Sequence, residues 1–213
     1  MLQLPGANAV EIPSHVKSSA TCPHGKVFNR TMNFTHPQIQ IKYKLVEENN
    51  IGRGGTAVVH HAYWPAAQRC IALKNAQLGS GTREVAILEH FNTLAEDERN
   101  HIIKIKINRD RMYIAMELGG EGLEDYRTRH NPGDIIMLFN LLKGAARALE
   151  QFHNHAIHLD IKQSNFVVSL DQNNRNEIAI KLIDFGTSVR LRNAGTASLN
   201  ILAQMHKAPE IQH

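Results

Sequence analysis

Residues 158–168 (HLDIKQSNFVV) place an acid, a base and an amide at short, fixed spacing just before two β-branched residues. Asp160 could accept a proton from an attacking hydroxyl group, and Lys162 could neutralise a phosphoryl group in transfer. Asn165 offers an amide oxygen to a hard cation such as Mg²⁺. These residue types indicate a loop that positions a phosphoryl group at the rigid start of a strand.

A second carboxylate follows, in the sequence IDFG. Asp184 lies beyond two apolar segments, NFVVSL and IAIKLI, which are joined by the polar run DQNNRNE and predict a β-hairpin. Such a hairpin would return Asp184 to Asn165, where both oxygens could bind one Mg²⁺ shared with phosphates. Each piece alone is more simply a polar turn or an ordinary loop, but together, in this order, they favour a metal site.

Residues 51–59 (IGRGGTAVV) indicate a glycine-rich turn between two strands. Glycine lets backbone N–H groups approach phosphates, although Gly-Gly turns also join many hairpins without this role. Lys74 lies on the next predicted strand, in IALK, where a lone lysine is usually solvated. Glu84, on the helix that follows, could pair with Lys74 and direct its ammonium group toward phosphate oxygens.

These groups depend on two predicted sets of elements. The first set is a small antiparallel sheet with one helix, predicted as strands at 43–51, 56–64, 69–76, 101–107 and 111–118 and a helix at 82–94. The second set begins with a long amphipathic helix at 134–153, with Pro132 and Asp134 in its first turn. The loop containing Asp160, the hairpin and DFG follow this helix.

Composition limits the class of protein. The 213 residues are 42% hydrophobic, enough for a core, and the net charge of +4 comes without a long basic run, so direct nucleic-acid binding is not expected. The N-terminus has no signal-peptide pattern, and no apolar stretch approaches the roughly 18 residues of a membrane span. We therefore expect a soluble intracellular protein with no membrane contact. Residues 1–40 lack periodicity and predict a disordered N-terminal extension.

The chain has thirteen histidines and two cysteines, Cys22 and Cys70. The histidines are scattered, and no Cys/His ligand spacing accompanies them, so surface or capping roles are favoured over a zinc site. Two lone cysteines indicate a reducing compartment rather than a disulfide framework.

Taken in order, the glycine-rich loop, IALK, the helix glutamate, HLDIKQSN, DFG and APE resemble the eukaryotic protein kinases over residues 44–213. IGRGG, MELGG, IKLIDFG and the absence of Arg before Asp160 are most similar to the monopolar-spindle dual-specificity kinases. The resemblance implies an α+β, bilobal fold. Its expected divisions are an extension at 1–40, a sheet-plus-helix N-lobe at 41–117, and a partial, mainly helical C-lobe at 118–213 that ends at the activation segment.

The resemblance also implies roles for single residues, with ATP and Mg²⁺ as cofactors. Asp160 would be the catalytic base, Lys162 its phosphate-facing partner, and Lys74 would bind phosphates while held by Glu84. The metal ligands would be Asn165 and Asp184. The implied nucleotide contacts are Ile51, Gly52, Gly54, Gly55, Val59, Ala72, Lys74, Met116 (the gatekeeper), Glu117, Leu118 and Val167. Leu88, His158 and Phe185 would stack as part of a regulatory spine, a role compatible with plain core packing.

Four departures from the family pattern stand out. Ala57 replaces the third glycine of the loop, and Leu159 replaces the Arg that usually precedes the catalytic Asp. The connection from Lys74 to Glu84 is short, although an extended chain of that length spans about 33 Å, so we expect a weakened hold on Glu84. The chain stops three residues after Glu210, so helices expected to cover 134–153 would be missing and a fragment or truncated gene model is an alternative.

Three hypotheses follow. The first is an ATP-dependent kinase acting on Ser or Thr of protein substrates, with Tyr as an alternative. The second is a catalytically weak or dead fragment that acts by nucleotide binding or interaction. The third, a phosphate-binding protein outside the kinases, leaves the arrangement of Asp160, Asn165 and Asp184 unexplained. The location would be nuclear or cytoplasmic, or the kinetochore if the spindle-kinase likeness holds, and the oligomeric state stays open.

Overall fold

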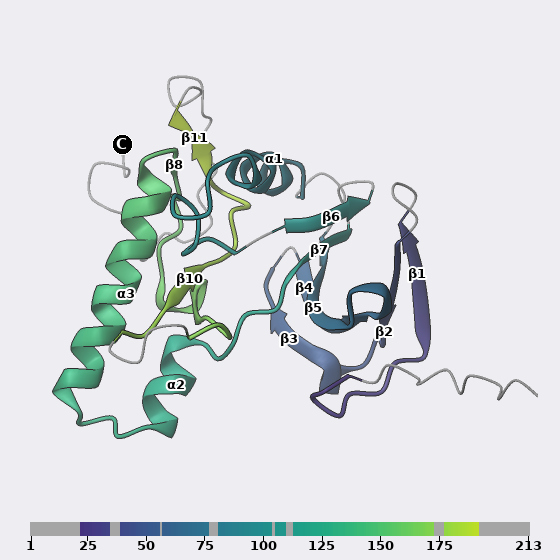
Figure 1. Ribbon diagram of the computed structural model, residues 1–213, viewed down its shortest axis with the longest axis horizontal. Coiled ribbons are helices and arrows are strands. Elements are labelled where there is room, and N and C mark those ends of the chain that lie inside the picture. The colour runs from purple at the N-terminus through teal and green to yellow at the C-terminus, as the bar shows by residue number, and fades with distance from the viewer. Residues whose placement is uncertain are drawn as a thin grey trace, which may run out of the picture.

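The computed structural model describes residues 22–34, 39–55, 57–76, 81–103, 113–172 and 177–191, and the backbone of 105–109. A curled sheet forms one side of the molecule and a mainly helical part forms the other, joined by the chain that leaves β7 (Figure 1). This arrangement confirms the bilobal α+β fold expected from the sequence.

The sheet lobe is antiparallel, with strand order β1-β2-β4-β5-β7-β6 and β3 paired with β4. In the described residues its strands are β1 (Arg30–Phe34), β2 (Ile39–Tyr43), β3 (Asn50–Arg53), β4 (Ala57–Trp64), β5 (Arg69–Ala76), β6 (Ile105–Arg109) and β7 (Tyr113–Glu117). Short 3-10 turns, η1 (Glu47–Asn49) and η2 (Pro65–Ala67), connect some of them. Helix α1 (Gly81–Asn92) follows β5 and buries Val85, Leu88 and Phe91.

The second lobe begins with α2 (Leu123–Arg129) and the long helix α3 (Ile135–His153). After these come the short pairs β8 (Ala156–Ile157) with β11 (Val189–Arg190), and β9 (Phe166–Val168) with β10 (Ile180–Leu182). The 3-10 turn η3 (Gln163–Asn165) leads directly into β9. In the described residues, no helix is both long and apolar enough to cross a membrane.

Helix α3 begins where the sequence predicts, because the Asp134 carboxylate accepts hydrogen bonds from the backbone N–H groups of Ile136 (2.9 Å) and Met137 (3.0 Å). Its buried face packs against β10 and comprises Met137, Leu141, Gly144, Ala148 and Phe152. Several apolar residues of the predicted stripe instead face solvent in the described structure, namely Ile135, Leu138, Phe139 and Leu142. Uncovered apolar surface along this helix was expected from the sequence.

A stack of three phenylalanines joins the two lobes. Phe152 of α3 stacks on Phe91 of α1, with ring centroids 5.2 Å apart, and on Phe185 of the DFG sequence at 5.0 Å. All three rings are at most 2% exposed. Burying aromatic rings of this size contributes a large share of a core's stability, so the DFG segment is fixed by the same contacts that hold α1 against α3.

Two predictions about the first 51 residues are wrong in part. The strand predicted at 43–51 is interrupted, because β2 ends at Tyr43 and η1 precedes β3; the Asn49 side chain is buried there and donates to the Val27 carbonyl. Part of the predicted disordered extension is ordered, since β1 pairs with β2 through Met32↔Ile41 and its neighbours. Residues 1–21 lie outside the described residues. Helix α2 was not predicted.

Candidate active site

Lys74 is the centre of an ionic cluster built from three separate elements. Its Nζ atom lies 2.6 Å from Oε2 of Glu84 on α1 and 2.9 Å from Oδ1 of Asp184 in the DFG sequence. Lys74 and Glu84 are buried, with side chains 9% and 2% exposed. The short connection between them does not prevent the pair, and the expected weak hold on Glu84 is not what the structure shows.

Burial and charge compete at this cluster. Burial alone would lower the pKa of Lys74, but the carboxylates of Glu84 and Asp184 outweigh it and raise the pKa. Burial likewise opposes ionisation of Asp184, yet Lys74 and Lys162 hold its pKa below the ordinary value. Burial raises the pKa of Glu84, and the contact with Lys74 acts against that rise. At neutral pH, Lys74 therefore carries a positive charge and Asp184 a negative one.

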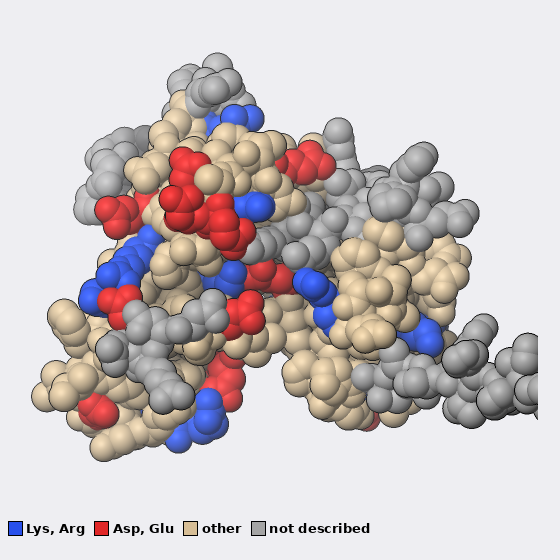
Figure 2. All heavy atoms as spheres, viewed as in Figure 1, with Lys and Arg blue, Asp and Glu red and all other residues tan. Residues whose placement is uncertain are grey.

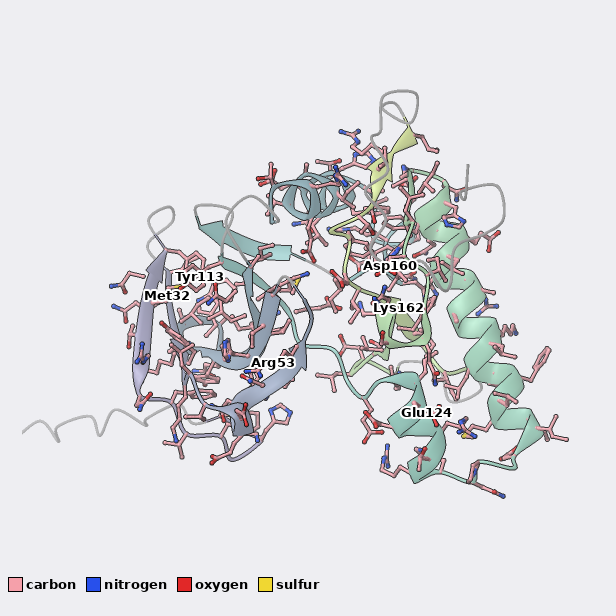
Figure 3. The ribbon with its side chains drawn as sticks, turned by 180° about the vertical axis from the view of Figure 1, so that it is seen from behind. Met32, Arg53, Tyr113, Glu124, Asp160 and Lys162 are labelled. Atoms are coloured by element: carbon pink, nitrogen blue, oxygen red, sulfur yellow. The ribbon has the colours of Figure 1, made fainter. Side chains whose placement is uncertain are left out.

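The segment containing Asp160 forms a tight local network. Lys162 donates from Nζ to Oδ2 of Asp160 at 2.7 Å, and Asn165 donates from its amide nitrogen to the Asp160 carbonyl at 2.6 Å. Asn165 is 3% exposed. Figure 3 shows Asp160 and Lys162 next to each other on the side of the helical lobe that faces the sheet lobe. The preceding Leu159 has φ 66°, a left-handed conformation that is costly for this residue type.

The predicted hairpin brings Asp184 back to Asn165. β9 and β10 pair with Leu182 opposite Phe166, and the Ile183 N–H donates to the Asn165 carbonyl at 2.9 Å. Asp184 then turns with φ 64°, another left-handed residue. Because the Asn165 amide uses its nitrogen on Asp160, its oxygen remains the atom suited to a metal. An amide oxygen and an ionised carboxylate are donors that Mg²⁺ accepts, so these residues fit that ion.

The glycine-rich residues that are expected to contact the nucleotide lie at the paired ends of β3 and β4. Gly52 pairs with Val59, and the Gly54 N–H donates to the Ala57 carbonyl at 2.9 Å, which closes the glycine-rich turn. Ile51 is 48% exposed at the start of that turn. Gly55 has open space beside its Cα. Figure 3 places Arg53, also in this turn, across from Asp160.

The segment after β7 lies against β9. Met116 is buried and pairs with Ala72, while Gly120 and Val168 are joined by a 2.8 Å backbone hydrogen bond. A Cβ atom on Gly119 would lie 2.7 Å from Cγ2 of Val167, so only glycine fits this approach. Of the expected nucleotide contacts, Ala72 and Met116 belong to one hydrophobic core and Leu118 packs against it, while Val167 lies beside Gly119.

A model of the protein kinase domain matches residues 45–212 of the chain. The chain belongs to the protein kinase family.

Curated relatives agree with this assignment. The kinase domain is 26% identical over 166 residues to the "Probable serine/threonine-protein kinase zyg-1" of Caenorhabditis briggsae, covering 76% of this chain and 23% of that protein. It is 29% identical over 140 residues to the "Serine/threonine-protein kinase 33" of Mus musculus, covering 61% and 27%. It is 28% identical over 188 residues to "Serine/threonine-protein kinase ULK1" of Homo sapiens, covering 80% and 17%. The chain thus spans about a quarter or less of the length of these relatives.

The predicted spine residues of the kinase domain come together. Leu88, His158 and Phe185 are all fully buried, and His158 packs edge-on against Phe185 with ring centroids 5.6 Å apart. Nε2 of His158 donates to the Ile183 carbonyl at 3.2 Å, so Nδ1 is the unprotonated nitrogen, and it has no hydrogen-bond partner among the described residues. Burial lowers the pKa of His158, so its ring is neutral at pH 7.

The two hydroxyl groups that directly follow the DFG sequence are held by hydrogen bonds to the backbone. Thr187 Oγ1 donates to the His158 carbonyl at 2.9 Å, and Ser188, fully buried, donates to the same carbonyl at 3.3 Å. Ser188 is therefore buried and not accessible as a phosphate acceptor. Arg190 contacts Nδ1 of His90 at 3.2 Å. The APE sequence, Arg192, Thr196 and Ser198 lie outside the described residues.

Two features escaped the sequence analysis. The buried Lys181 of β10 forms an ion pair with the half-buried Glu117 at 2.5 Å, which ties the end of β7 to the second lobe. The predicted register of the hairpin could not reveal this ion pair, because Glu117 lies on β7 and the placement of β7 relative to β10 was not known from the sequence. His60 and His61 are 5% and 4% exposed rather than at the surface, and His61 belongs to a cluster of four Cys and His side chains.

A polar pocket also lies between α3 and the β9–β10 hairpin, lined in part by Lys143, Arg147 and Glu177. Lys143 and Arg147 both pair with Glu177. Figure 2 shows basic side chains along α3 with acidic ones directly beside them. Glu177 therefore balances both of these cations, and none of the candidate catalytic residues lines this pocket.

Proposed function

We propose that this chain is a Mg²⁺-dependent protein kinase that transfers the γ-phosphate of ATP to Ser or Thr hydroxyl groups of a protein substrate. The observation that carries the proposal is the meeting of Lys74, Glu84 and Asp184 at 2.6 and 2.9 Å, beside the network of Asp160, Lys162 and Asn165. The groups come from four separate segments, and ordinary core packing gives no reason to bury Lys74 and Glu84 together beside the carboxylate of Asp184.

Each residue has a defined task in such a transfer. Asp160 accepts the proton of the substrate hydroxyl group. The oxygen of that hydroxyl bonds to the γ-phosphorus while the bond from this phosphorus to the bridging oxygen of ADP breaks. Lys74 binds phosphate oxygens on the ADP side of that bond, and Glu84 fixes the orientation of the Lys74 side chain. Lys162 balances charge near Asp160. Mg²⁺, held by Asn165 and Asp184, would supply further neutralisation of phosphate charge.

The decisive experiment compares phosphate transfer by the wild-type chain and by the Asp160→Asn variant, using radiolabelled ATP and a generic protein substrate. A positioned base contributes about 10²–10⁴-fold, so the variant should lose transfer by that factor while keeping nucleotide affinity. Asp97→Asn, an exposed carboxylate remote from the cleft, is the matched control and should keep full activity. Equal activity in wild type and Asp160→Asn would exclude Asp160 as the base.

A second function is favoured by one observation. Ile135, Ile136, Phe139 and Leu142 of α3 are 61–80% exposed in the described structure, as expected for a surface that contacts another protein. A nucleotide-binding module that acts through interaction would show a Mg·ATP-dependent thermal shift with no transfer by the wild-type chain. The likeness to the monopolar-spindle kinases, Tyr as an acceptor and a kinetochore location stay predictions. Profiling the phosphorylated residue type would test the first two.

A further inference from the structure

Four metal-binding side chains converge on the sheet lobe, away from the cleft: Cys22, His24, His61 and Cys70. Their ligand atoms all lie within 4.8 Å of one another. The Cys22 and Cys70 sulfur atoms are 3.1 Å apart, and Cys22 Sγ is 3.5 Å from Nε2 of His61. Nδ1 of His24 lies 3.2 Å from Cys70 and 3.9 Å from Cys22. We call this set the Cys2His2 cluster.

The fold produces the cluster from two local structures. Residues 22–25 (CPHG) form a β-turn, closed by a 3.1 Å hydrogen bond from the Gly25 N–H to the Cys22 carbonyl. Pro at the second position and Gly at the fourth are typical of such turns, and Gly25 has a positive φ of 68°. The turn therefore presents Cys22 and His24 side by side.

The other two ligands come from the β4–β5 pair. Cys70 lies directly opposite Tyr63, and His61 is two residues before Tyr63 on the same strand. Because alternate residues of a strand share one face, His61 and Cys70 point to the same side of the sheet as diagonal neighbours. Residues 22–28 precede β1, on a segment that runs along the lower edge of the sheet in Figure 1. Ligands from three separate segments thus meet at one point.

The spacing agrees with tetrahedral coordination. Zinc bonds to Cys sulfur at about 2.3 Å and to His nitrogen at about 2.0–2.1 Å, so neighbouring ligand atoms lie roughly 3.3–3.8 Å apart. Four of the six separations between ligand atoms are 3.1–3.9 Å, close to that range, and all six are within 4.8 Å. A disulfide needs a sulfur–sulfur bond of about 2.05 Å, and both cysteines are free thiols here. Two sulfur and two nitrogen ligands with no open position are typical of structural zinc.

The surroundings suit a structural ion. Cys22 and His61 are buried, and the Phe28 ring stacks on His61 at 6.1 Å and on Tyr63 at 6.4 Å, which limits water access. Burial, and to a smaller extent the neighbouring His24 and Lys26, lower the pKa of His61. The cluster of two neutral thiols and two imidazoles would release two protons on binding a divalent cation, leaving a site with no net charge.

We propose that the Cys2His2 cluster binds one structural Zn²⁺ ion, which fastens the segment before β1 to strands β4 and β5. The ion would fix one end of the β4–β5 strand pair, and the other end of this pair carries Val59 and Lys74. Cys70 and Lys74 lie on the same strand, four residues apart. Zinc occupancy does not depend on phosphoryl transfer, so the proposal stands or falls separately from the kinase function.

Metal analysis of the purified full-length chain tests the proposal. Elemental mass spectrometry should find about one zinc per chain after gel filtration, and the cobalt-substituted protein should show absorption bands of tetrahedral cobalt with thiolate ligands. Cys22→Ser and Cys70→Ser should lose the metal. His24→Gln changes the one exposed ligand, and we expect it to fold and to weaken zinc retention against a chelator by at least about 10-fold.

His153→Gln is the matched control, since His153 is an exposed histidine on α3, and it should retain zinc as the wild type does. The proposal is overturned if the folded wild-type chain carries no zinc and cobalt gives no tetrahedral spectrum. It is equally overturned if His24→Gln and the wild type retain zinc alike. Intact mass measurement showing a Cys22–Cys70 disulfide in place of metal would also overturn it.

Discussion

Lys74 on β5 and Asp184 in the DFG sequence are 110 residues apart in the chain, yet their charged atoms are 2.9 Å apart. The hairpin of β9 and β10 carries Asp184 to this place, and the Phe152–Phe185 stack holds it there. Lys74 also contacts Glu84, so one ammonium group connects β5, α1 and the second lobe. This shared cation makes the stability of the fold and the chemistry of the site depend on the same residue.

Removing Lys74 should therefore destabilise the protein as well as inactivate it. Lys74→Met leaves Glu84 buried without a counter-charge, and breaking a buried pair in this way costs about 3–5 kcal/mol. Adding Glu84→Leu should recover most of that loss, because two apolar residues can replace a buried ion pair at little cost. Urea unfolding of both single variants and the double variant measures the effect. Strictly additive losses would show that the pair is not coupled.

Asp184→Asn should selectively remove the metal dependence of nucleotide binding. Asparagine tolerates the left-handed backbone of Asp184 (φ 64°) and keeps an oxygen for Lys74, but it lacks the charge that attracts Mg²⁺. We expect Mg²⁺ to improve ATP affinity in the wild type and to improve it at least about 10-fold less in the variant, a difference near 1.4 kcal/mol. Calorimetric titration with and without Mg²⁺ decides this. Identical magnesium effects in both proteins would rule Asp184 out as a ligand.

Gly144→Ala tests how closely α3 packs on β10. Alanine normally favours a helix by about 1 kcal/mol, but a Cβ atom here would lie 2.6 Å from the Ile178 carbonyl oxygen and from Cγ1 of Ile180. We expect a net loss of about 1–3 kcal/mol in unfolding free energy. Gly133→Ala, whose Cβ would meet its nearest atom at 3.5 Å, is the control and should change little. A stabilising Gly144→Ala would mean that the helix can shift.

The buried His158 should make the protein sensitive to acid. Burial lowers its pKa in the folded state, although Asp184 and Asp160 partly oppose this. Below the ordinary histidine pKa near 6.5 the unfolded chain binds the proton more readily, so stability is present above that pH and declines as pH falls below it. His158→Phe keeps a ring against Phe152 and Phe185 and removes the titration. Thermal midpoints between pH 7 and pH 5 should fall less steeply for the variant, and parallel curves would contradict the assignment.

Local sequence was sufficient for many elements. Strand-like segments separated by turn residues located β4 and β5, the 3.6-residue period located α1 and α3, and Asp134 marked the start of α3 by capping it. Local sequence was not sufficient where contacts with residues distant in the chain set the backbone conformation. The polar run before β3 formed a 3-10 turn in which the buried Asn49 side chain donates to the Val27 carbonyl, and β1 formed because an edge strand, β2, was available for pairing.

By itself the sequence determined the inventory of the site, since Asp160, Lys162, Asn165 and Asp184 are recognisable by type and order. Only the tertiary structure decided which charges meet, because a contact such as Lys74 with Asp184 or Lys181 with Glu117 depends on how two lobes pack. The same holds for Cys22 and Cys70. Spacing along the chain could not suggest a metal site there, because its ligands become neighbours only through the register of β4 with β5 and the turn that lies beside them.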